Sequence, residues 1–175
     1  MIAIREAFWP DDAAAVAALD TSFTTGEVLS VEMSPDEIRL RPAPLAEPLT
    51  KRFPLDDLRS SDRPWDHAWV AEEDGACRGF AAVGLQAWNR RLVLWHLYVD
   101  SPARRRGMGR RLVERAIAHG RDIGASHLWL ETSHLNAPGV QAYRRMGFGL
   151  CGVDATLYRS TPADGEVALF FALLL

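Results

Sequence analysis

The hydrophobic pattern of this chain changes its period partway along, and this change restricts the folds available to it. Between residues 68 and 99 the apolar residues form runs typical of strands, and Glu73-Asp74-Gly75 provides a turn between the first two runs. Over residues 112–117 the apolar spacing becomes helical, and another strand-like run and a second helical segment follow. Hairpins followed by strand–helix–strand units predict an α/β fold with a mixed, mostly antiparallel central sheet flanked by helices.

The same reasoning gives expected boundaries along the chain. We expect helices over residues 10–19, over a segment that Gly120 ends, and over residues 138–146, which Gly147 ends. Residues 21–26 are expected to form a loop. The expected strands cover residues 2–6, 68–72, 76–86, 91–99, 126–132, 148–151, 153–158 and 167–174.

Residues 35–64 are rich in proline, with six of the ten prolines at positions 35, 42, 44, 48, 54 and 64. Proline lacks a backbone N–H, so this stretch is not expected to sustain a long helix or a central strand. We predict an irregular excursion with a short helix near residues 55–59. An excursion of this length serves either as a substrate-binding loop or as a surface linker, and both interpretations stay open. With 175 residues, the chain is expected to form a single domain over residues 1–175.

The composition excludes several classes of protein. The chain is 48% hydrophobic and 25% charged, which argues against collagen-like and disordered proteins. No apolar run approaches the ~20 residues of a membrane helix, and early charges interrupt any signal-peptide core, so we expect a cytoplasmic protein without a membrane partner. The apolar stretch 167–175 suits either an inner strand or a homodimer contact.

Cysteines and histidines give little sign of metal or disulfide chemistry. Two cysteines are too few for a disulfide framework, and Cys151 is expected to be a buried thiol. Four of the five histidines show no metal-ligand spacing; they are His67, His119, His127 and His134.

Basic residues are concentrated in one segment. Nineteen of the 20 basic residues are arginines, and seven of these fall between residues 104 and 121. The net charge of −3 and the lack of a nucleic-acid reader motif argue against a nucleic-acid partner. A local basic patch on a mildly acidic chain is better suited to a compact anion.

The segment of residues 100–112 follows a strand and opens a helix with the sequence Asp-Ser-Pro-Ala-Arg-Arg-Arg-Gly-Met-Gly-Arg-Arg-Leu. Gly107 and Gly109 carry no side chain, so backbone N–H groups can approach a bound group closely. The helix N-terminus adds unpaired donors and a partial positive charge, which suit a phosphate. We therefore expect a pyrophosphate site, with a basic helix start carrying two flexible glycines as the alternative. Leu112 and the lack of Gly-Lys-Ser/Thr exclude the dinucleotide fingerprint and the P-loop.

The strand, the Arg104-x-x-Gly107-x-Gly109 loop and the amphipathic helix together resemble the acyl-CoA-binding loop of the GNAT superfamily of N-acetyltransferases. Asn136, Tyr143 and Gly147-Phe148 are similar to a later motif of that superfamily. The resemblance covers most of the chain except the proline-rich stretch. Further segments resemble the streptothricin acetyltransferases within it, namely Leu19-Asp20-Thr-Ser-Phe23-Thr-Thr, Gly79-Phe80-Ala-Ala-Val83, Ala87-Trp88-Asn89, Leu128-Trp-Leu-Glu131-Thr132, Tyr143-Arg-Arg-Met-Gly-Phe148, Cys151-Gly-Val-Asp154 and Leu157-Tyr158.

The resemblance implies acetyl-CoA as the co-substrate, no metal, a small-molecule amine as the acceptor, and direct transfer in a ternary complex. It also implies that Asn136 contacts the arm of the cofactor and that Tyr143 lies near the thioester sulfur. The backbone of Leu97, Tyr98 and Val99 would pair with the pantetheine arm. The pyrophosphate would be held by Arg104 and by the amides of Arg105, Arg106, Gly107, Met108, Gly109 and Arg110.

The chemistry of acetyl transfer requires an acid and a base. Attack by an amine on a thioester expels a thiolate, and Tyr143 is the candidate that protonates it, with a satisfied core aromatic as the alternative. An alkylamine is mostly protonated at neutral pH, so a base is needed as well. His96 and Glu131 are the candidate bases, acting through water, and each also has a purely structural interpretation. Asp154 and Tyr158 are candidate substrate contacts, or else a turn residue and a packed aromatic.

One departure from the resemblance bears on the acceptor. The streptothricin pattern implies acidic residues in the strand segment 95–98, whereas this chain has no acid between Asp74 and Asp100. A less basic acceptor, or a flat aromatic one, would suit such a strand. We expect an acetyl-CoA-dependent N-acetyltransferase for a primary amine, with streptothricin as a candidate acceptor and antibiotic resistance as the outcome. A non-catalytic acyl-CoA-binding sensor or interaction domain is the alternative.

Overall fold

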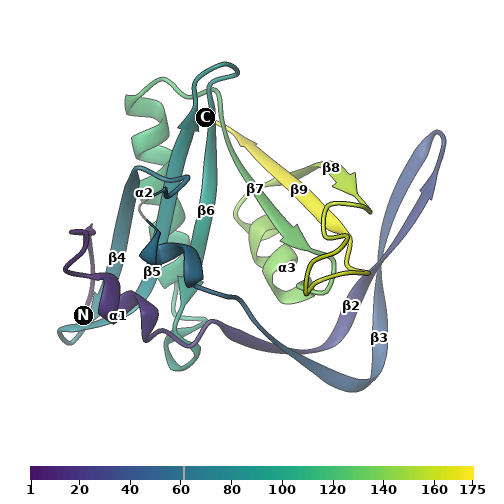
Figure 1. Ribbon diagram of the computed structural model, residues 1–175, viewed down its shortest axis with the longest axis horizontal. Helices are drawn as coiled ribbons and strands as arrows, with labels where there is room; N and C mark the ends of the chain where they lie inside the picture. The colour runs from purple at the N-terminus through teal and green to yellow at the C-terminus, as the bar shows by residue number, and fades with distance from the viewer. Residues whose placement is uncertain (61) are drawn as a thin grey trace. The chain divides into compact units, whose positions relative to one another are not determined.

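The computed structural model describes residues 1–60 and 62–175, and the chain divides into two compact units, neither of them continuous in sequence. Figure 1 follows the chain by colour from the N-terminus to the C-terminus. The first unit comprises Met1–Phe23, Arg52–Trp129 and Leu174–Leu175, and the second comprises Thr24–Lys51 and Leu130–Leu173. The elements in chain order are β1 (Ile2–Glu6), α1 (Ala13–Ala17), β2 (Ser22–Ser34), β3 (Glu37–Arg52), the 3-10 helix η1 (Asp56–Arg59), β4 (His67–Glu73), β5 (Ala76–Gln86), β6 (Arg91–Val99), the 3-10 helix η2 (Ser101–Ala103), α2 (Met108–Asp122), β7 (His127–Ser133), α3 (Ala137–Arg145), β8 (Gly149–Asp154) and β9 (Ala168–Leu174).

The strands of the first unit follow the order β1-β4-β5-β6-β7. The first three pairings are antiparallel, and the expected hairpin between β4 and β5 is confirmed, with Asp74 and Gly75 both at positive φ in its turn. Strands β6 and β7 pair in parallel, with Val93 opposite Trp129. Parallel neighbours need a crossover connection, and α2 provides it.

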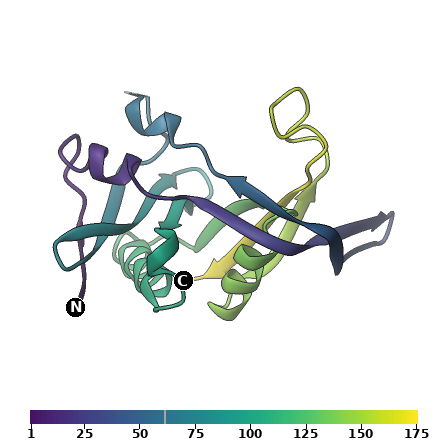
Figure 2. The same cartoon turned by 90° about the horizontal axis from the view of Figure 1, so that it is seen from below.

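Helices cover both faces of the strands in the first unit. Figure 2 shows α2 on one side of these strands and α1 with η1 on the other. On the α2 side, Leu112 and Ala116 are fully buried. On the opposite side, Val16 of α1 and Leu58 of η1 pack with Phe80 of β5 in one apolar cluster. A sheet covered on both faces explains why the middle of β5 is a continuous apolar run rather than an alternating one.

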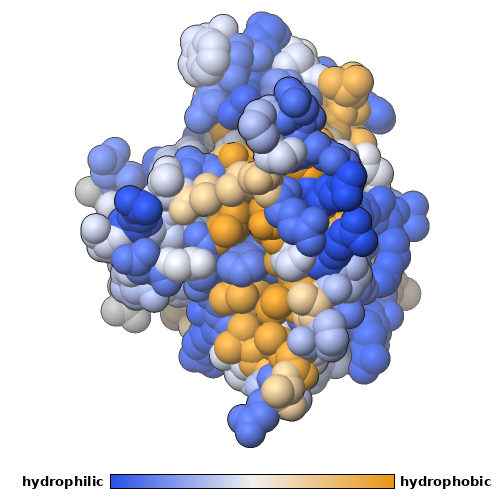
Figure 3. Space-filling model, turned by 90° about the vertical axis from the view of Figure 1, so that its right-hand side faces the viewer, coloured by the Kyte–Doolittle hydropathy of each residue, from blue (hydrophilic) through white to orange (hydrophobic). Residues whose placement is uncertain are grey.

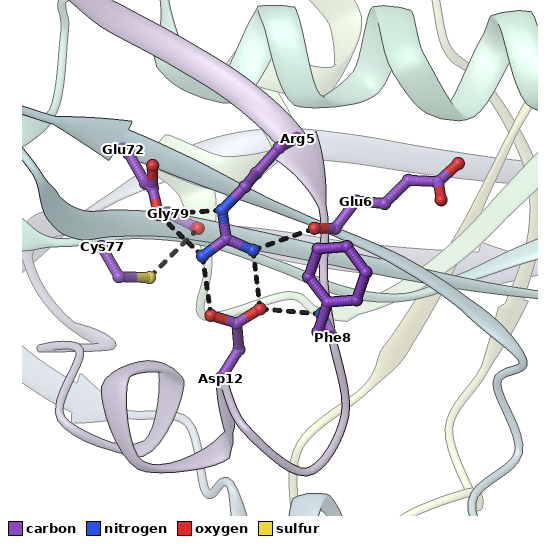
Figure 4. A network of polar contacts seen from close by, with 7 residues as sticks. All are labelled: Arg5, Glu6, Phe8, Asp12, Glu72, Cys77 and Gly79. Carbon is purple, nitrogen blue, oxygen red and sulfur yellow. Dashed lines mark hydrogen bonds and ion pairs between the residues drawn. The ribbon is translucent and has the colours of Figure 1, made fainter.

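Arg5 connects β1 to its neighbours in the first unit (Figure 4). Its guanidinium donates two hydrogen bonds of 2.8 Å to Asp12 and two, of 2.9 and 2.7 Å, to one oxygen of Glu72. This arginine holds the pKa of the Asp12 carboxyl below its usual range. Close by, the Sγ of Cys77 donates to the Gly79 carbonyl, and burial raises the pKa of this thiol, so Cys77 acts as a packing residue.

Helix α2 ends later than the sequence predicts. Gly120 lies inside the helix, and a Cβ there would come within 2.5 Å of Leu175 and 3.1 Å of Leu92, so a close approach of side chains requires this glycine. The residue that follows the end of the helix in the left-handed conformation is Gly124, with φ of +67°. Gly147, with φ of +97°, ends α3 as predicted.

In the second unit the strand order is β7-β9-β8, with β8 and β9 antiparallel. Because β7 contributes residues to both units, the seven strands follow the order β1-β4-β5-β6-β7-β9-β8, which is the mixed, mostly antiparallel sheet that the sequence predicts. Ala168, Leu169 and Phe171 of β9 are fully buried. The apolar stretch at the end of the chain is therefore an inner strand.

Two local predictions of secondary structure are wrong, one for residues 148–158 and one for residues 21–26. The strands expected over 148–151 and 153–158 are one strand, β8, which has a register shift between Leu150 and Gly152 and gives way to turns after Asp154. The loop expected over 21–26 is the start of β2, where threonines and Phe23 favour the extended backbone.

The proline-rich stretch is the largest difference from prediction. Residues Glu37–Arg52 form β3, which pairs with β2 alone in a two-stranded sheet, while the short helix near 55–59 is confirmed as η1. Pro42, Pro44 and Pro48 all occupy even positions, so the missing donors lie along one edge of the strand. A strand with a single neighbour leaves one edge unpaired, and proline is tolerated there. The prediction of an irregular excursion is therefore wrong over 37–52.

Among the described residues, no helix is long and apolar enough to cross a membrane. Large apolar side chains do reach the surface, as Figure 3 shows for one side of the molecule. In the second unit these include Met33, Ile38, Leu150 and Leu157. Cys151, next to Leu150, is also exposed, so the expectation of a buried thiol is wrong.

Candidate active site

The loop before α2 has the backbone geometry of an anion site. Gly107, the N-cap residue of α2, adopts a left-handed conformation with φ of +84°, and Arg105 is also left-handed. As a glycine, this N-cap residue has no side chain that could accept a capping hydrogen bond from the first turn of α2. The N–H groups of the first turn and the positive end of the 15-residue helix are thus available to a negatively charged group. A Cβ on Gly109 would lie 3.5 Å from Val99, so the helix also starts close to the end of β6.

The arginines of this loop divide into two kinds. Arg104 donates to the carbonyls of Val99 and Asp20, both at 2.9 Å, and Arg106 forms a paired ion contact with Glu73. These two guanidinium groups hold the loop together. Arg105 and Arg110 are exposed, the latter 3.3 Å from Glu114 in the next turn. Met108, expected near the pyrophosphate, has its side chain buried in the core at 1% exposure.

The end of β6 pairs on one side with β5, with Leu97 opposite Ala81, Tyr98 opposite Phe80 and Val99 opposite Gly79. On the other side, the parallel register with β7 covers residues 91–93 of β6. The three residues expected to meet the pantetheine arm therefore lie beyond that register, directly before the loop that Arg104 holds to Val99.

His96 is the buried member of a polar group in the first unit. Its side chain is 7% exposed, and its Nε2 lies 2.6 Å from Oδ2 of Asp57 on η1. Its Nδ1 lies 3.4 Å from the Tyr98 hydroxyl. The rings of Trp65, Phe80 and Tyr98 surround it, with ring centroids 5.6 to 6.3 Å away. Burial lowers the pKa of His96, and the charge of Asp57 acts in the opposite direction.

A second polar group lies in the second unit around Glu131. Glu131 accepts a short hydrogen bond from the Tyr158 hydroxyl, and Lys51 forms a short ion pair with Glu166. Burial raises the pKa of Glu131, whereas the Tyr158 hydrogen bond and the charge of Lys51 lower it. The pKa of Tyr158 is raised by burial and by the Glu131 carboxylate. Two carboxylates and one ammonium thus share a partly buried region of this unit.

Tyr143 on α3 packs against two aromatic rings of the same unit, with centroid distances of 6.0 Å to Phe148 and 6.4 Å to Phe171. Burial of its hydroxyl, assisted by the negative charge of Glu131, raises the pKa of Tyr143 to about 12. The phenol therefore keeps its proton throughout the neutral range and can act only as a donor of that proton.

Two other expected site residues have structural partners. The side-chain oxygen of Asn136 accepts from the Gly139 N–H at 3.0 Å and its amide donates to Thr132 at 3.0 Å, so Asn136 caps α3. Asp154 accepts from the backbone N–H and the hydroxyl of Thr156, at 2.6 and 2.7 Å. This is the turn interpretation that the sequence left open for Asp154.

Asp57, Lys51 and Glu166 are polar partners that sequence reasoning missed. Asp57 is 39 residues from His96, and Glu166 is 115 residues from Lys51, so no local spacing indicates either pair. The only sequence signal for Asp57 is its position in the short helix expected near 55–59. The strand around His96 lacks acids, yet η1 brings the Asp57 carboxylate to it. Among the described residues, no group of three or more His, Cys, Asp or Glu side chains is arranged to hold a metal ion.

Comparison with known proteins adds a family and several relatives. Residues 32–148 match the model of the acetyltransferase (GNAT) family. A streptothricin acetyltransferase from Streptomyces lavendulae is 42% identical over 171 residues, covering 94% of this chain and 90% of that protein. The crystal structure of a nourseothricin acetyltransferase superposes with a TM-score of 0.89 at 44% identity, covering 99% of this chain and 98% of that one.

A more distant structural relative carries a ligand. A protein from Bacillus anthracis str. Ames, solved in complex with acetyl coenzyme A, superposes with a TM-score of 0.84 and covers 100% of both chains. Its identity to this chain is 22%, so this similarity shows only that the two proteins share a fold.

Proposed function

Because this chain belongs to the acetyltransferase (GNAT) family, we propose that it transfers the acetyl group of acetyl-CoA to a primary amine of a streptothricin-type antibiotic. The family, the α/β fold and the N-acetyltransferase class expected from the sequence are confirmed, and the non-catalytic alternative is set aside. The choice of a streptothricin-type acceptor is supported by the 42% identity, over 94% of the chain, to the Streptomyces lavendulae enzyme. Acetylation of such an antibiotic in the cytoplasm would give resistance to it.

We further propose that residues 1–175 act as one acetyltransferase domain. The match to the nourseothricin acetyltransferase structure over 99% of the chain supports this proposal. Residues 35–64 stay a candidate substrate-binding segment, now with a defined 3-10 helix at Asp56–Arg59.

The residues around the start of α2 fit the phosphates of acetyl-CoA. When bound, this co-substrate supplies the acetyl group as an activated thioester. The left-handed Gly107 and the free first-turn amides suit a pyrophosphate, and the exposed Arg105 and Arg110 supply positive charge. Arg104 would act by fixing the loop to Val99. The backbone groups of Leu97, Tyr98 and Val99 are the proposed partners of the pantetheine arm.

The titratable residues supply the proton transfers. The Tyr143 hydroxyl, protonated up to about pH 12, would act as the acid by donating a hydrogen bond to the departing sulfur anion. Of the two candidate bases, Glu131 already accepts the Tyr158 hydroxyl, whereas the neutral ring of His96 keeps a lone pair for a proton from the amine, taken through water. Within the second unit, the carboxylates of Glu131 and Glu166 would favour a cationic acceptor.

The test is release of CoA thiol from acetyl-CoA, followed with a thiol reagent across streptothricin, an aminoglycoside, a polyamine, free amino acids and a lysine peptide. We expect release with streptothricin well above all other amines, and a product heavier by one acetyl group on the streptothricin amine. Release with a different amine and none with streptothricin would contradict the acceptor while leaving the enzyme class in place. A sample without amine gives the hydrolysis background.

A further inference from the structure

We propose that Asp57 is a positioning residue for the acetyl transfer described above: it fixes the imidazole of His96 so that Nδ1, the nitrogen facing Tyr98, is the one that accepts a proton. This inference rests on the proposed function, because it assigns the base of that reaction. It concerns residues of the first unit only, namely Asp57 of η1 and His96 and Tyr98 of β6.

The distances distinguish the two ring nitrogens of His96. Nε2 lies 2.6 Å from Oδ2 of Asp57, the distance of a strong, charge-assisted hydrogen bond. Nδ1 lies 3.4 Å from the Tyr98 hydroxyl, which is long for a hydrogen bond. One nitrogen is therefore firmly engaged and the other only loosely.

These partners determine where the proton of the neutral ring resides. An ionised carboxylate can only accept hydrogen bonds, so the nitrogen facing Asp57 must carry the hydrogen. In a neutral imidazole the other nitrogen then has a free lone pair. Nδ1 is thus the basic nitrogen, and the proton of the amine reaches it through a water molecule or through the Tyr98 hydroxyl, which gives its proton to Nδ1 as it takes one from the amine. A base oriented by a third group is a recurring arrangement in enzymes that activate nucleophiles.

The surroundings keep this base neutral until it is used. Among the side chains that the structure describes, the titratable groups hydrogen-bonded to the ring are the Asp57 carboxylate from η1 and the Tyr98 hydroxyl from the same strand. Trp65, before β4, and Phe80 of β5 contribute uncharged rings. Burial among these rings lowers the pKa of His96, and Asp57 partly offsets this by favouring the protonated ring. At neutral pH the ring is therefore ready to accept a proton, and the imidazolium that forms is stabilised by Asp57.

The exposure of the Asp57 side chain makes it suitable for substitution. Its side chain is 39% exposed, in contrast to the 7% of His96, so replacing it leaves the core of the first unit intact. Asp57→Asn keeps the size and an acceptor oxygen but removes the charge. Asp57→Glu restores the charge. Asp36→Asn, in the exposed turn between β2 and β3, is a matched control that changes the same functional group far from His96 in sequence.

The experiment measures the dependence of kcat/KM on pH for the wild type and these variants, with the acceptor that the wild type acetylates. We expect Asp57→Asn to lower kcat by roughly 10- to 100-fold with little change in the KM of the amine. Because Asp57 raises the pKa of His96, its removal should move the acidic limb of the profile to lower pH. Asp57→Glu should recover part of kcat, and Asp36→Asn should match the wild type. If the Asp57→Asn variant keeps the wild-type kcat and the wild-type position of the acidic limb of the pH profile, the inference is overturned.

A second measurement is independent of turnover. Nitrogen NMR of histidine-labelled protein reports which ring nitrogen of His96 carries the hydrogen, with His96→Gln identifying the signal. The inference predicts hydrogen on Nε2 in the wild type and a mixture of tautomers or a lower pKa in Asp57→Asn. Hydrogen on Nδ1 in the wild type would overturn it. Failure of the proposed function would appear differently, as a wild-type enzyme that does not acetylate streptothricin.

Discussion

Tyr143 and Glu131 are coupled through charge within the second unit, and the coupling gives the tyrosine a definite chemical role. Burial of the phenol, with a smaller effect from the Glu131 carboxylate, raises the pKa of Tyr143 to about 12. Because a thiol has a pKa of about 8.5, the departing thiolate is a weaker base than this phenolate, so the phenol stabilises the thiolate by donating a hydrogen bond to it. The ring itself is anchored by Phe148 and Phe171, so hydroxyl and ring have separable functions.

The Tyr143→Phe variant tests this separation. We expect kcat to fall by roughly 10- to 100-fold because the hydrogen-bond donor is lost, while the ring contacts keep the melting temperature close to that of the wild type. Steady-state kinetics at saturating acetyl-CoA and a thermal melt give both values. Wild-type kcat should also show no basic limb from Tyr143 below about pH 10. An unchanged kcat in a folded variant would show that Tyr143 is only a core aromatic.

The residues of the candidate site could be predicted only where local sequence carries the signal. Gly107 and Gly109 were identified because a loop between a strand and a helix has a recognisable pattern, and Gly107 does adopt the left-handed conformation. The contact between Asp57 and His96 could not be predicted, because it joins residues 39 positions apart through a short helix. Asn136 was found for its motif, but its observed hydrogen bonds are those of a helix cap.

Strand β3 shows that proline is compatible with a strand when the missing N–H lies on an edge without a neighbouring strand. The sequence predicts strands β4, β5 and β6 closely because each contains a mostly apolar run bounded by turn residues. Strand β3 was missed because its prolines argue against a strand, and only the pairing with β2 alone makes them acceptable. The end of α2 was placed at Gly120 because the sequence does not reveal that Leu92 and Leu175 approach that glycine.

A matched pair of proline substitutions tests the edge explanation. Ala46 is exposed and shares the even parity of Pro42, Pro44 and Pro48, whereas Ala43 is half-buried and has the opposite parity. We expect Ala46→Pro to change the free energy of unfolding by less than about 0.5 kcal/mol. Ala43→Pro should lower it by about 1–3 kcal/mol, because a β2 carbonyl loses its donor. Urea denaturation measures both. Equal losses in the two variants would contradict the parity argument.

At the scale of the whole molecule, the histidines make stability depend on pH. Burial is the largest cause of a lowered pKa at His96, His119, His127 and His134, and at His119 the stacked ring of His67, 4.1 Å away, adds to it. A histidine whose pKa is lower in the folded state than in the unfolded one binds a proton on unfolding. Their contribution to stability is therefore complete above the unfolded pKa near 6.5 and is lost as the pH falls below it.

We therefore expect the melting temperature to decrease as the pH is lowered from 7.5 through about 6.5 to 5. Differential scanning calorimetry at constant ionic strength measures this decrease. His119→Asn should reduce the slope, since it removes one of the protons taken up on unfolding and relieves the contact with His67. A melting temperature that rises on acidification over this range would contradict the argument.

The division of the chain into two units also restricts how such a protein can arise and be altered. The chain passes from one unit to the other at residues 23–24, 51–52, 129–130 and 173–174, and the third passage falls inside strand β7. Neither unit can therefore be encoded by a single uninterrupted stretch of gene, exchanged by one recombination event or expressed as one fragment. A new acceptor specificity therefore cannot be acquired by exchanging either unit as one continuous segment of the chain.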